Sequence, residues 1–149
     1  MRSTEKYGPK KDAALSMWVK LARASATFGR KSNESIKSFG LTEPQFGVLE
    51  TLGHLGTMTI GNLCKKQLVS GGNMTLVIDN LTREGLVQRI PSVEDRRAII
   101  VELTDAGQKL FDKVFIKHAE DIERFASVLT DDEIATLSKL LKKLGKSLV

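Results

Sequence analysis

The chain has 149 residues, of which 41% are apolar and 28% charged, and its formal net charge is +5. Length and composition predict a single domain over residues 1–149 and exclude a disordered chain, a collagen-like repeat and a disulfide scaffold. No run approaches the ~18 apolar residues of a membrane-spanning helix, and the single cysteine, Cys64, cannot close an intramolecular disulfide, so we expect a cytoplasmic protein without membrane contact.

Two helices are predicted in the first third of the chain. Apolar residues at helical spacing predict a long helix from Asp12 to about Ser38, which Gly40 stops. The segment Thr42-Glu-Pro-Gln45 then has the pattern of a capping box, with proline in the first helical turn, where its missing N–H is no loss. It begins a second helix that ends near Gly53.

Two shorter helices follow, joined by a tight turn. Thr59 caps the third helix, and Ser70 caps a fourth, which runs to about Glu84. Gly85 is placed for the left-handed conformation that often follows a helix. One stripe of the fourth helix is expected to face the core: Met74, Val77, Ile78 and Leu81.

After the fourth helix the period of the apolar residues changes to that of a strand. Residues 86–90 and 98–103 are rich in β-branched side chains and flank a charged loop of about seven residues. They predict a β-hairpin, the wing, with Glu-Asp-Arg-Arg at positions 94–97. The expected fold is mainly α with a small β-hairpin (α+β). Two short helices joined by a tight turn and followed by a two-stranded hairpin are the winged helix-turn-helix arrangement, whose second helix, the recognition helix, enters the major groove of DNA. We therefore expect residues 41–104 to form a winged helix-turn-helix DNA-binding lobe.

Two long helices are predicted after the hairpin. Thr104 opens the first, and the segment 130–133 is a second capping box. One small domain cannot cover the broad apolar faces of these helices and of the first helix, so we expect residues 12–40 and 105–147 to form a helical dimerisation lobe. Packing within one chain is the alternative for each candidate contact. The candidates are Leu15, Val19, Phe111, Phe115, Phe125, Leu137, Leu140, Leu144 and Leu148.

Positive charge suits a polyanionic partner such as DNA. Residues 1–40 carry nine basic and three acidic side chains, whereas residues 59–101, which include the recognition helix and the wing, carry six and four. So small a local excess would bind DNA weakly as a monomer, and a homodimer would double it.

The recognition helix and the wing carry the residue types that read double-stranded DNA. A helix fits the major groove, where asparagine suits adenine and the threonine methyl group suits thymine. Paired arginines on a projecting loop suit a narrow minor groove. A plain turn at the glycines, solvated polar side chains and a charged loop in which Asp95 or Asp79 braces one arginine are the alternatives. The candidate DNA contacts are Ser70, Gly71, Gly72, Asn73, Thr75, Leu76, Arg96 and Arg97.

Residues Ser70–Val87, Glu94–Arg97 and Val101–Gly107 together resemble the multiple antibiotic resistance regulator (MarR) family, and Leu41–Leu49 is similar to its second helix. The resemblance spans roughly residues 12–145. It implies a homodimeric transcription regulator, usually a repressor on a short pseudo-palindromic operator, and in many members a small anionic or phenolic effector. Position 76 departs from the family, because many relatives have arginine there and Leu76 can neither hold a phosphate nor read guanine.

The resemblance also implies an effector pocket between the dimerisation helices and the DNA-binding lobe. Its candidate lining residues are Trp18, Arg23 and Phe46. Cys64, beside two lysines, has the surroundings of a redox-active thiol, but its helical spacing also fits the core.

Other functional classes have less support. His54 and His118 lack zinc-ligand spacing, and we expect both to be solvated. The chain shows no nucleophile–base pair and no phosphate-binding loop, so we expect no enzymatic activity, cofactor or metal. A winged-helix adaptor that meets an acidic protein is the alternative function, but such a wing has no special need of paired arginines.

Overall fold

The structure is a computed structural model that describes residues 4–67 and 71–149. Ser70, the predicted cap of the recognition helix, lies outside the described residues. The predicted helices and the predicted hairpin follow the expected order, and the structure adds a short 3-10 helix and a third strand. In chain order they are η1 (Glu5–Tyr7), α1 (Pro9–Ser38), α2 (Glu43–Leu55), β1 (Met58–Thr59), α3 (Ile60–Gln67), α4 (Gly71–Arg83), β2 (Val87–Pro91), β3 (Ile99–Leu103), α5 (Asp105–Ala126) and α6 (Asp131–Lys146).

Several helix ends lie where the capping signals predict. At the start of α2, the backbone N–H of Gln45 donates to Thr42 Oγ1 (3.3 Å), and the N–H of Thr42 donates to Gln45 Oε1 (2.9 Å). Thr130 and Glu133 form the same capping box at the start of α6. Gly85 follows α4 with a φ of 72°, the left-handed conformation that glycine adopts without strain. These local predictions are confirmed.

Two features differ from the prediction. α1 begins at Pro9, three residues before the expected Asp12, because proline is well accommodated in a first helical turn. The hairpin is also part of a three-stranded antiparallel sheet with the order β1-β3-β2, in which Met58 of β1 pairs with Val101 of β3. Strand β1 has only two residues, too few to show a period of two.

The hydrophobic core lies mainly in the lobe built from α2, α3, α4, the sheet and the first half of α5. As predicted, Met74, Ile78 and Leu81 of α4 are completely or almost completely buried. The prediction that Phe111 belongs to the dimer surface is wrong: its side chain is 5% exposed and joins this core. A Cβ at Gly53 would lie 2.4 Å from Phe111 Cε1, so the ring packs directly against the backbone of α2.

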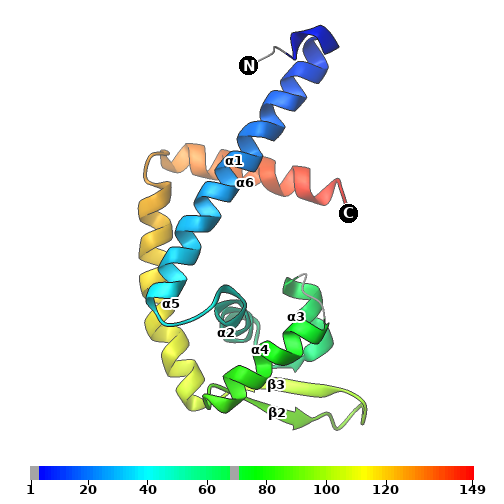
Figure 1. Ribbon diagram of the computed structural model, residues 1–149, viewed down its shortest axis with the longest axis vertical. Helices are drawn as coiled ribbons and strands as arrows, with labels where there is room; N and C mark the ends of the chain where they lie inside the picture. The colour runs from blue at the N-terminus through cyan, green and yellow to red at the C-terminus, as the bar shows by residue number, and fades with distance from the viewer. Residues whose placement is uncertain (1–3, 68–70) are drawn as a thin grey trace.

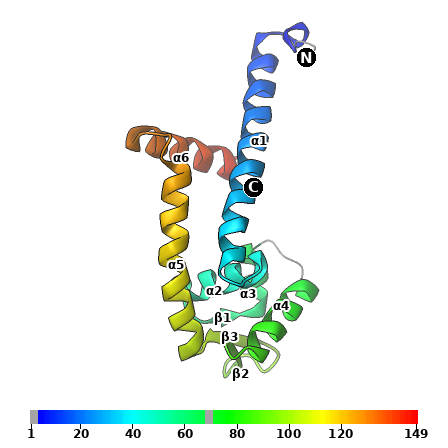
Figure 2. The same ribbon diagram turned by 60° about the vertical axis from the view of Figure 1, so that its left-hand side comes forward.

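The remaining helices form an open arm above this lobe (Figures 1 and 2). α1 and α5 pack against each other where they rise from the lobe, whereas the N-terminal half of α1 projects beyond the rest of the chain. α6 turns away from the end of α5 and contains no buried residue. The N-terminal half of α1 and the whole of α6 are therefore two arms that leave apolar side chains uncovered, including Leu15, Trp18, Leu137 and Leu140.

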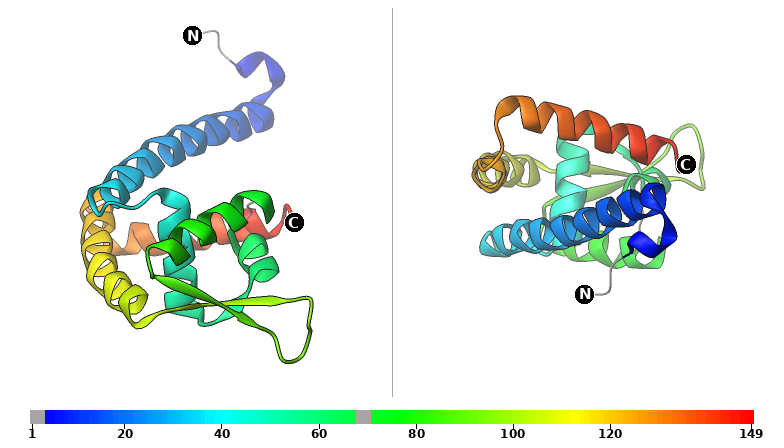
Figure 3. Two further views of the ribbon diagram at one scale, coloured as in Figure 1. Left: turned by 60° about the horizontal axis from the view of Figure 1, so that its bottom comes forward. Right: turned by 90° about the horizontal axis from the view of Figure 1, so that it is seen from above.

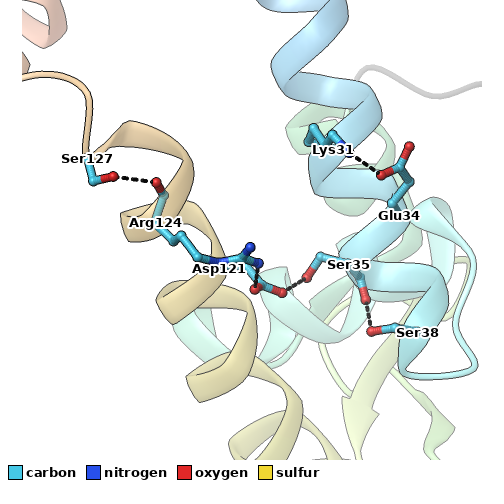
Figure 4. Close-up of polar contacts among 7 residues, drawn as sticks. All are labelled: Lys31, Glu34, Ser35, Ser38, Asp121, Arg124 and Ser127. Atoms are coloured by element: carbon cyan, nitrogen blue, oxygen red, sulfur yellow. Dashed lines mark hydrogen bonds and ion pairs between the residues drawn. The ribbon is translucent and has the colours of Figure 1, made fainter.

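Polar contacts fix α1 against α5 (Figure 4). Ser35 Oγ donates to Asp121 Oδ2 at 2.7 Å, and Arg124, one turn further along α5, forms an ion pair with the same carboxylate. The hydrogen bond from Ser35 and the bond and charge of Arg124 lower the pKa of Asp121. The carboxylate is therefore ionised at neutral pH and bridges the two helices.

Candidate nucleic-acid interface

α4 exposes the face predicted for the recognition helix. Because its apolar stripe faces the core, Gly72, Asn73, Thr75 and Leu76 lie on the opposite, exposed side. Leu76 is 60% exposed, so its apolar side chain is accessible to a partner molecule. Gly71 is the first residue of α4, and a Cβ at Gly72 would meet nothing within 4 Å. Among the described residues, nothing therefore blocks a close approach to Gly72.

The wing tip has a defined turn. The N–H of Asp95 donates to Ser92 Oγ (3.2 Å), and Asp95 Oδ1 accepts from the backbone N–H of Arg97 (2.9 Å). Arg96 and Arg97 are both exposed. In the part of the chain that the structure describes, no ion pair involves either guanidinium, so both charges remain available to an anionic partner.

Asp79 of α4 forms an ion pair with Arg89 of β2. The hypothesis that Asp79 or Asp95 braces Arg96 or Arg97 through a guanidinium is therefore wrong. Asp79 pairs with a different arginine, and Asp95 binds the backbone of the wing instead. The sequence places Asp79 and Arg89 ten residues apart on different elements, with no local pattern that joins them.

α4 and the β2–β3 hairpin lie together at the end of the molecule opposite the α1 and α6 arms (Figure 3, left). β2 pairs with β3 over its five residues, with Arg89 opposite Val101. The ion pair thus joins the recognition helix to strand β2 of the wing.

The candidate effector residues do not come together within one chain. Phe46 is buried and borders a groove that is also lined by Ser32 of α1 and His118 of α5. Trp18, 59% exposed, and Arg23, also exposed, precede Ser32 in α1 by 14 and 9 residues. At 1.5 Å per residue, they lie about 21 Å and about 13.5 Å from Ser32 along the helix axis. The assignment of these three residues to one pocket stays a prediction.

His118 is a functional candidate that the sequence analysis missed. The expectation that it is solvated is wrong, because its side chain is only 9% exposed and its ring lies 4.7 Å from that of Phe46. Its spacing from Phe111, Val114 and Phe115 places it on the inward face of α5, which was the available signal. His54, in contrast, is exposed as expected and packs edge-on against Phe111 and Phe115.

Other candidate chemistries gain no support here. Cys64 is a free thiol that is partly buried against the core, as its helical spacing predicts. Residues 4–67 and 71–149 contain no group of three or more histidine, cysteine or acidic side chains placed to hold a metal ion. Within the same ranges, no helix combines the length and the apolarity that crossing a membrane requires.

The short helices α3 and α4 and an arginine-tipped hairpin, held together by one core and one ion pair, form a winged helix-turn-helix. This arrangement is that of a DNA-binding transcription regulator, in which the second helix enters the major groove.

Comparison with known proteins also gives a DNA-binding transcription regulator and identifies its family. Residues 41–99 match the model of the MarR family. The chain is 31% identical to the HTH-type transcriptional regulator MhqR of Bacillus subtilis over 134 residues, which cover 90% of this chain and 92% of MhqR. It is 33% identical to the multiple antibiotic resistance protein MarR of Escherichia coli, over 76% of this chain and 80% of that protein. The chain belongs to the MarR family.

Solved structures show the same fold. A mutant MarR from E. coli complexed with operator DNA has a TM-score of 0.78 and 28% identity, and the match covers 89% of this chain and 96% of that one. AbsC, a MarR family regulator from Streptomyces coelicolor, has a TM-score of 0.82 at 23% identity, over 92% and 95% of the two chains. These relatives support a DNA-binding regulator rather than a protein–protein adaptor.

Proposed function

We propose that the protein is a ligand-responsive repressor that binds a short pseudo-palindromic operator in double-stranded DNA as a homodimer. The carrying observation is that α4 exposes Asn73, Thr75 and Leu76, and that the wing, which lies beside α4 at the same end of the molecule, exposes Arg96 and Arg97. α4 would enter the major groove and the wing arginines the adjacent minor groove. The complex of a mutant E. coli MarR with operator DNA supports DNA as the partner. A regulator of this kind acts where the chromosome lies, in the cytoplasm.

Each exposed residue of α4 and of the wing tip has a proposed contact with DNA. Asn73 and Thr75 read base edges, and Leu76 packs against a thymine methyl group. Ser70, Gly71 and Gly72 bring the start of the helix and its partial positive charge close to a phosphate. The two wing arginines are attracted by the strong negative potential of a narrow minor groove.

Dimerisation would use the arms. α6 carries Leu137, Leu140 and Leu141 with 41–56% of each side chain exposed, and α1 adds Leu15 and Val19 at 37–39%. A second copy is the economical cover for such helices, because a C2 interface buries the same face twice. Residues 12–40 and 105–147 then form a dimerisation lobe and residues 41–104 the DNA-binding lobe of a single domain. Twofold symmetry would set the two α4 helices about 34–36 Å apart, one turn of DNA.

A mobility-shift assay with DNA from upstream of the protein's own gene, at two salt concentrations, tests this function. A regulator that contacts phosphates should lose affinity steeply with salt, with a log–log slope near −0.9 per phosphate contact. Binding that is no stronger than binding to random DNA of the same length would contradict the proposal.

A further inference from the structure

The end of the wing exposes apolar side chains as well as its two arginines. Pro91 and Ile99 are the pair of the β2–β3 ladder nearest the tip, and both are exposed. Val93, two residues beyond Pro91, is 99% exposed. Among the described residues, the hydrophobic core includes none of these three side chains. The end of the wing therefore offers an apolar surface beside its charges, and Val93 is fully open to a partner.

Hydrogen bonds hold the loop that carries Val93 in one shape. The backbone N–H of Ser92 donates to the carbonyl of Ala98 at 3.2 Å, and the N–H of Ala98 donates to the carbonyl of Asp95 at 3.0 Å. The bond from the Asp95 N–H to Ser92 Oγ closes the turn in which Val93 lies. Valine is also stiff about χ1, because it branches at Cβ. Val93 can therefore contact a partner with little loss of conformational freedom.

The charges at the wing tip cancel. Glu94 and Asp95 are acidic and Arg96 and Arg97 are basic, so residues 94–97 carry no net formal charge. Net electrostatic attraction between the tip as a whole and DNA is therefore weak. Uncharged contacts gain weight where such a tip enters a groove.

Val93 suits the floor of a minor groove better than Glu94 does. Phosphates of both strands line this groove, which is only about 6 Å wide, so its negative potential repels a carboxylate. A valine side chain carries no charge, and proteins that bind the minor groove often place apolar side chains there. Val93, rather than Glu94, is therefore the neighbour of the arginines that can lie against the base edges.

One group on the floor of the minor groove distinguishes the base pairs. A·T and T·A pairs show only acceptors, adenine N3 and thymine O2, whereas a G·C pair adds the 2-amino donor of guanine. Arginine has donors and no acceptor, and the side chain of valine has neither. The wing can therefore satisfy the acceptors of an A·T pair, but Val93 would leave a guanine amino group without a hydrogen bond, which is costly.

We propose that Val93 enters the minor groove beside the wing arginines and selects A·T pairs by excluding the 2-amino group of guanine. Its side chain fills the space that this amino group occupies in a G·C pair, while Arg96 and Arg97 donate to adenine N3 and thymine O2. The inference rests on the proposed function, because it requires the wing to enter the minor groove of an operator. It assigns part of the base specificity to an uncharged residue of the wing.

Three versions of the upstream DNA test this role in a mobility-shift assay. Inosine in place of guanine removes the 2-amino group from every G·C pair, and 2,6-diaminopurine in place of adenine adds it to every A·T pair. Neither change alters the donors and acceptors of the major groove that α4 would read. The unmodified protein should bind inosine DNA at least as tightly as ordinary DNA, and diaminopurine DNA about tenfold more weakly. Equal affinity for ordinary and diaminopurine DNA would overturn the proposal.

Val93→Thr isolates the contribution of Val93 from other effects of the modified bases. Threonine has nearly the same size, and its hydroxyl can accept a hydrogen bond from the amino group. This variant should lose most of the penalty for diaminopurine DNA. Val128→Thr makes the same change at an 86% exposed valine beyond the far end of the 22-residue helix α5, and it should keep the full penalty. A penalty that persists in Val93→Thr, or that falls equally in Val128→Thr, would refute the role of Val93.

The same DNAs separate this inference from its competitors. If Glu94 accepted a hydrogen bond from guanine instead, the unmodified protein would bind ordinary DNA more tightly than inosine DNA, which would contradict the proposal. Specific binding of ordinary upstream DNA that ignores the amino group would refute the role of Val93 and leave the proposed function intact. Binding no stronger than to random DNA would contradict both.

Discussion

Asp79 of α4 and Arg89 of β2 form the ion pair that joins the recognition helix to the wing. Both side chains are partly exposed, so we assign the pair a role in geometry more than in stability. Exposed pairs typically contribute about 0–1 kcal/mol to the free energy of unfolding. A shift in the angle between helix and wing would instead prevent both from reaching their grooves together, because docking requires positions accurate to a fraction of an ångström.

Asp79→Asn should therefore weaken operator binding by about tenfold or more while lowering the free energy of unfolding by less than about 1 kcal/mol. Glu34→Gln, which breaks the exposed Lys31–Glu34 pair of α1 (3.0 Å), is the matched control and should leave operator affinity unchanged. Mobility shift and urea denaturation measure the two effects. Equal losses of affinity in both variants would argue against a specific role for the α4–β2 pair.

Arg96→Ala together with Arg97→Ala should remove specific DNA binding and leave the dimer intact, because both side chains are exposed at the wing tip and far from the arms. Lys10→Ala with Lys11→Ala removes two charges near the start of α1 and should reduce affinity much less. Sedimentation and mobility shift provide the measurements. A monomeric double arginine variant, or one with unchanged DNA affinity, is the contrary result.

Asn73→Ala should cost ~1–3 kcal/mol of binding free energy at the operator and little on random DNA, the signature of a base contact rather than a phosphate contact. Competition titrations with the two DNAs give the difference directly. Equal losses on both would assign Asn73 to the backbone of the duplex.

Gly107→Ala should destabilise the junction between the hairpin and α5. A Cβ at this position would lie 1.9 Å from the carbonyl oxygen of Leu86, which already accepts the N–H of Thr104 at 3.1 Å. The backbone must move to admit it, at about 1–3 kcal/mol or more of unfolding free energy. Gly29→Ala, in open space within α1, should be neutral or stabilising by up to about 1 kcal/mol. Denaturation curves in which the two variants match would contradict this description of the junction.

The bridge between α1 and α5 predicts a dependence on pH. The hydrogen bond from Ser35 and the bond and charge of Arg124 lower the pKa of Asp121 from its ordinary value of 3.8. The folded-state pKa is thus below the unfolded-state pKa, so the bridge stabilises the fold fully above the unfolded value and is lost as pH falls through the folded value.

Ser35→Ala should then be less stable than the unmodified protein at neutral pH, and the difference should disappear in strong acid. Ser38→Ala removes a hydroxyl that, among the described residues, donates to the Ser35 carbonyl (2.6 Å) and not to Asp121, and it should show no such convergence. Denaturant titrations of the unmodified protein and both variants, from neutral pH to below the folded-state pKa of Asp121, measure whether the stabilities converge. A difference between Ser35→Ala and the unmodified protein that persists in acid would mean that Asp121 is not the group responsible.

Local signals predicted most of the fold. The capping boxes at Thr42 and Thr130 and the left-handed Gly85 depend on residues within one turn of each other, so the sequence shows them directly. β1 was missed because two residues carry no period. Phe111 was misplaced because an apolar helix face predicts burial without saying whether the same chain or a second copy covers it.

The parts of the candidate site that depend on local patterns were predicted, whereas contacts between distant elements were not. The exposed face of α4 follows from its apolar stripe, and the wing arginines follow from the hairpin pattern. The Asp79–Arg89 pair and the groove at Phe46 and His118 join elements that are distant in sequence, and one sequence contains no signal for such contacts. Trp18 and Arg23 were grouped with Phe46 through family resemblance, which does not specify distances within this chain.

The central claim is that two copies of α4 occupy successive major grooves of one operator. Methylation interference at guanine N7 in the bound upstream DNA tests it most directly, because that atom lies in the major groove. The account predicts two clusters of interfering guanines, related by twofold symmetry, with centres about 10–10.5 base pairs apart. A single cluster, or bound DNA in which major-groove methylation has no effect, would contradict it.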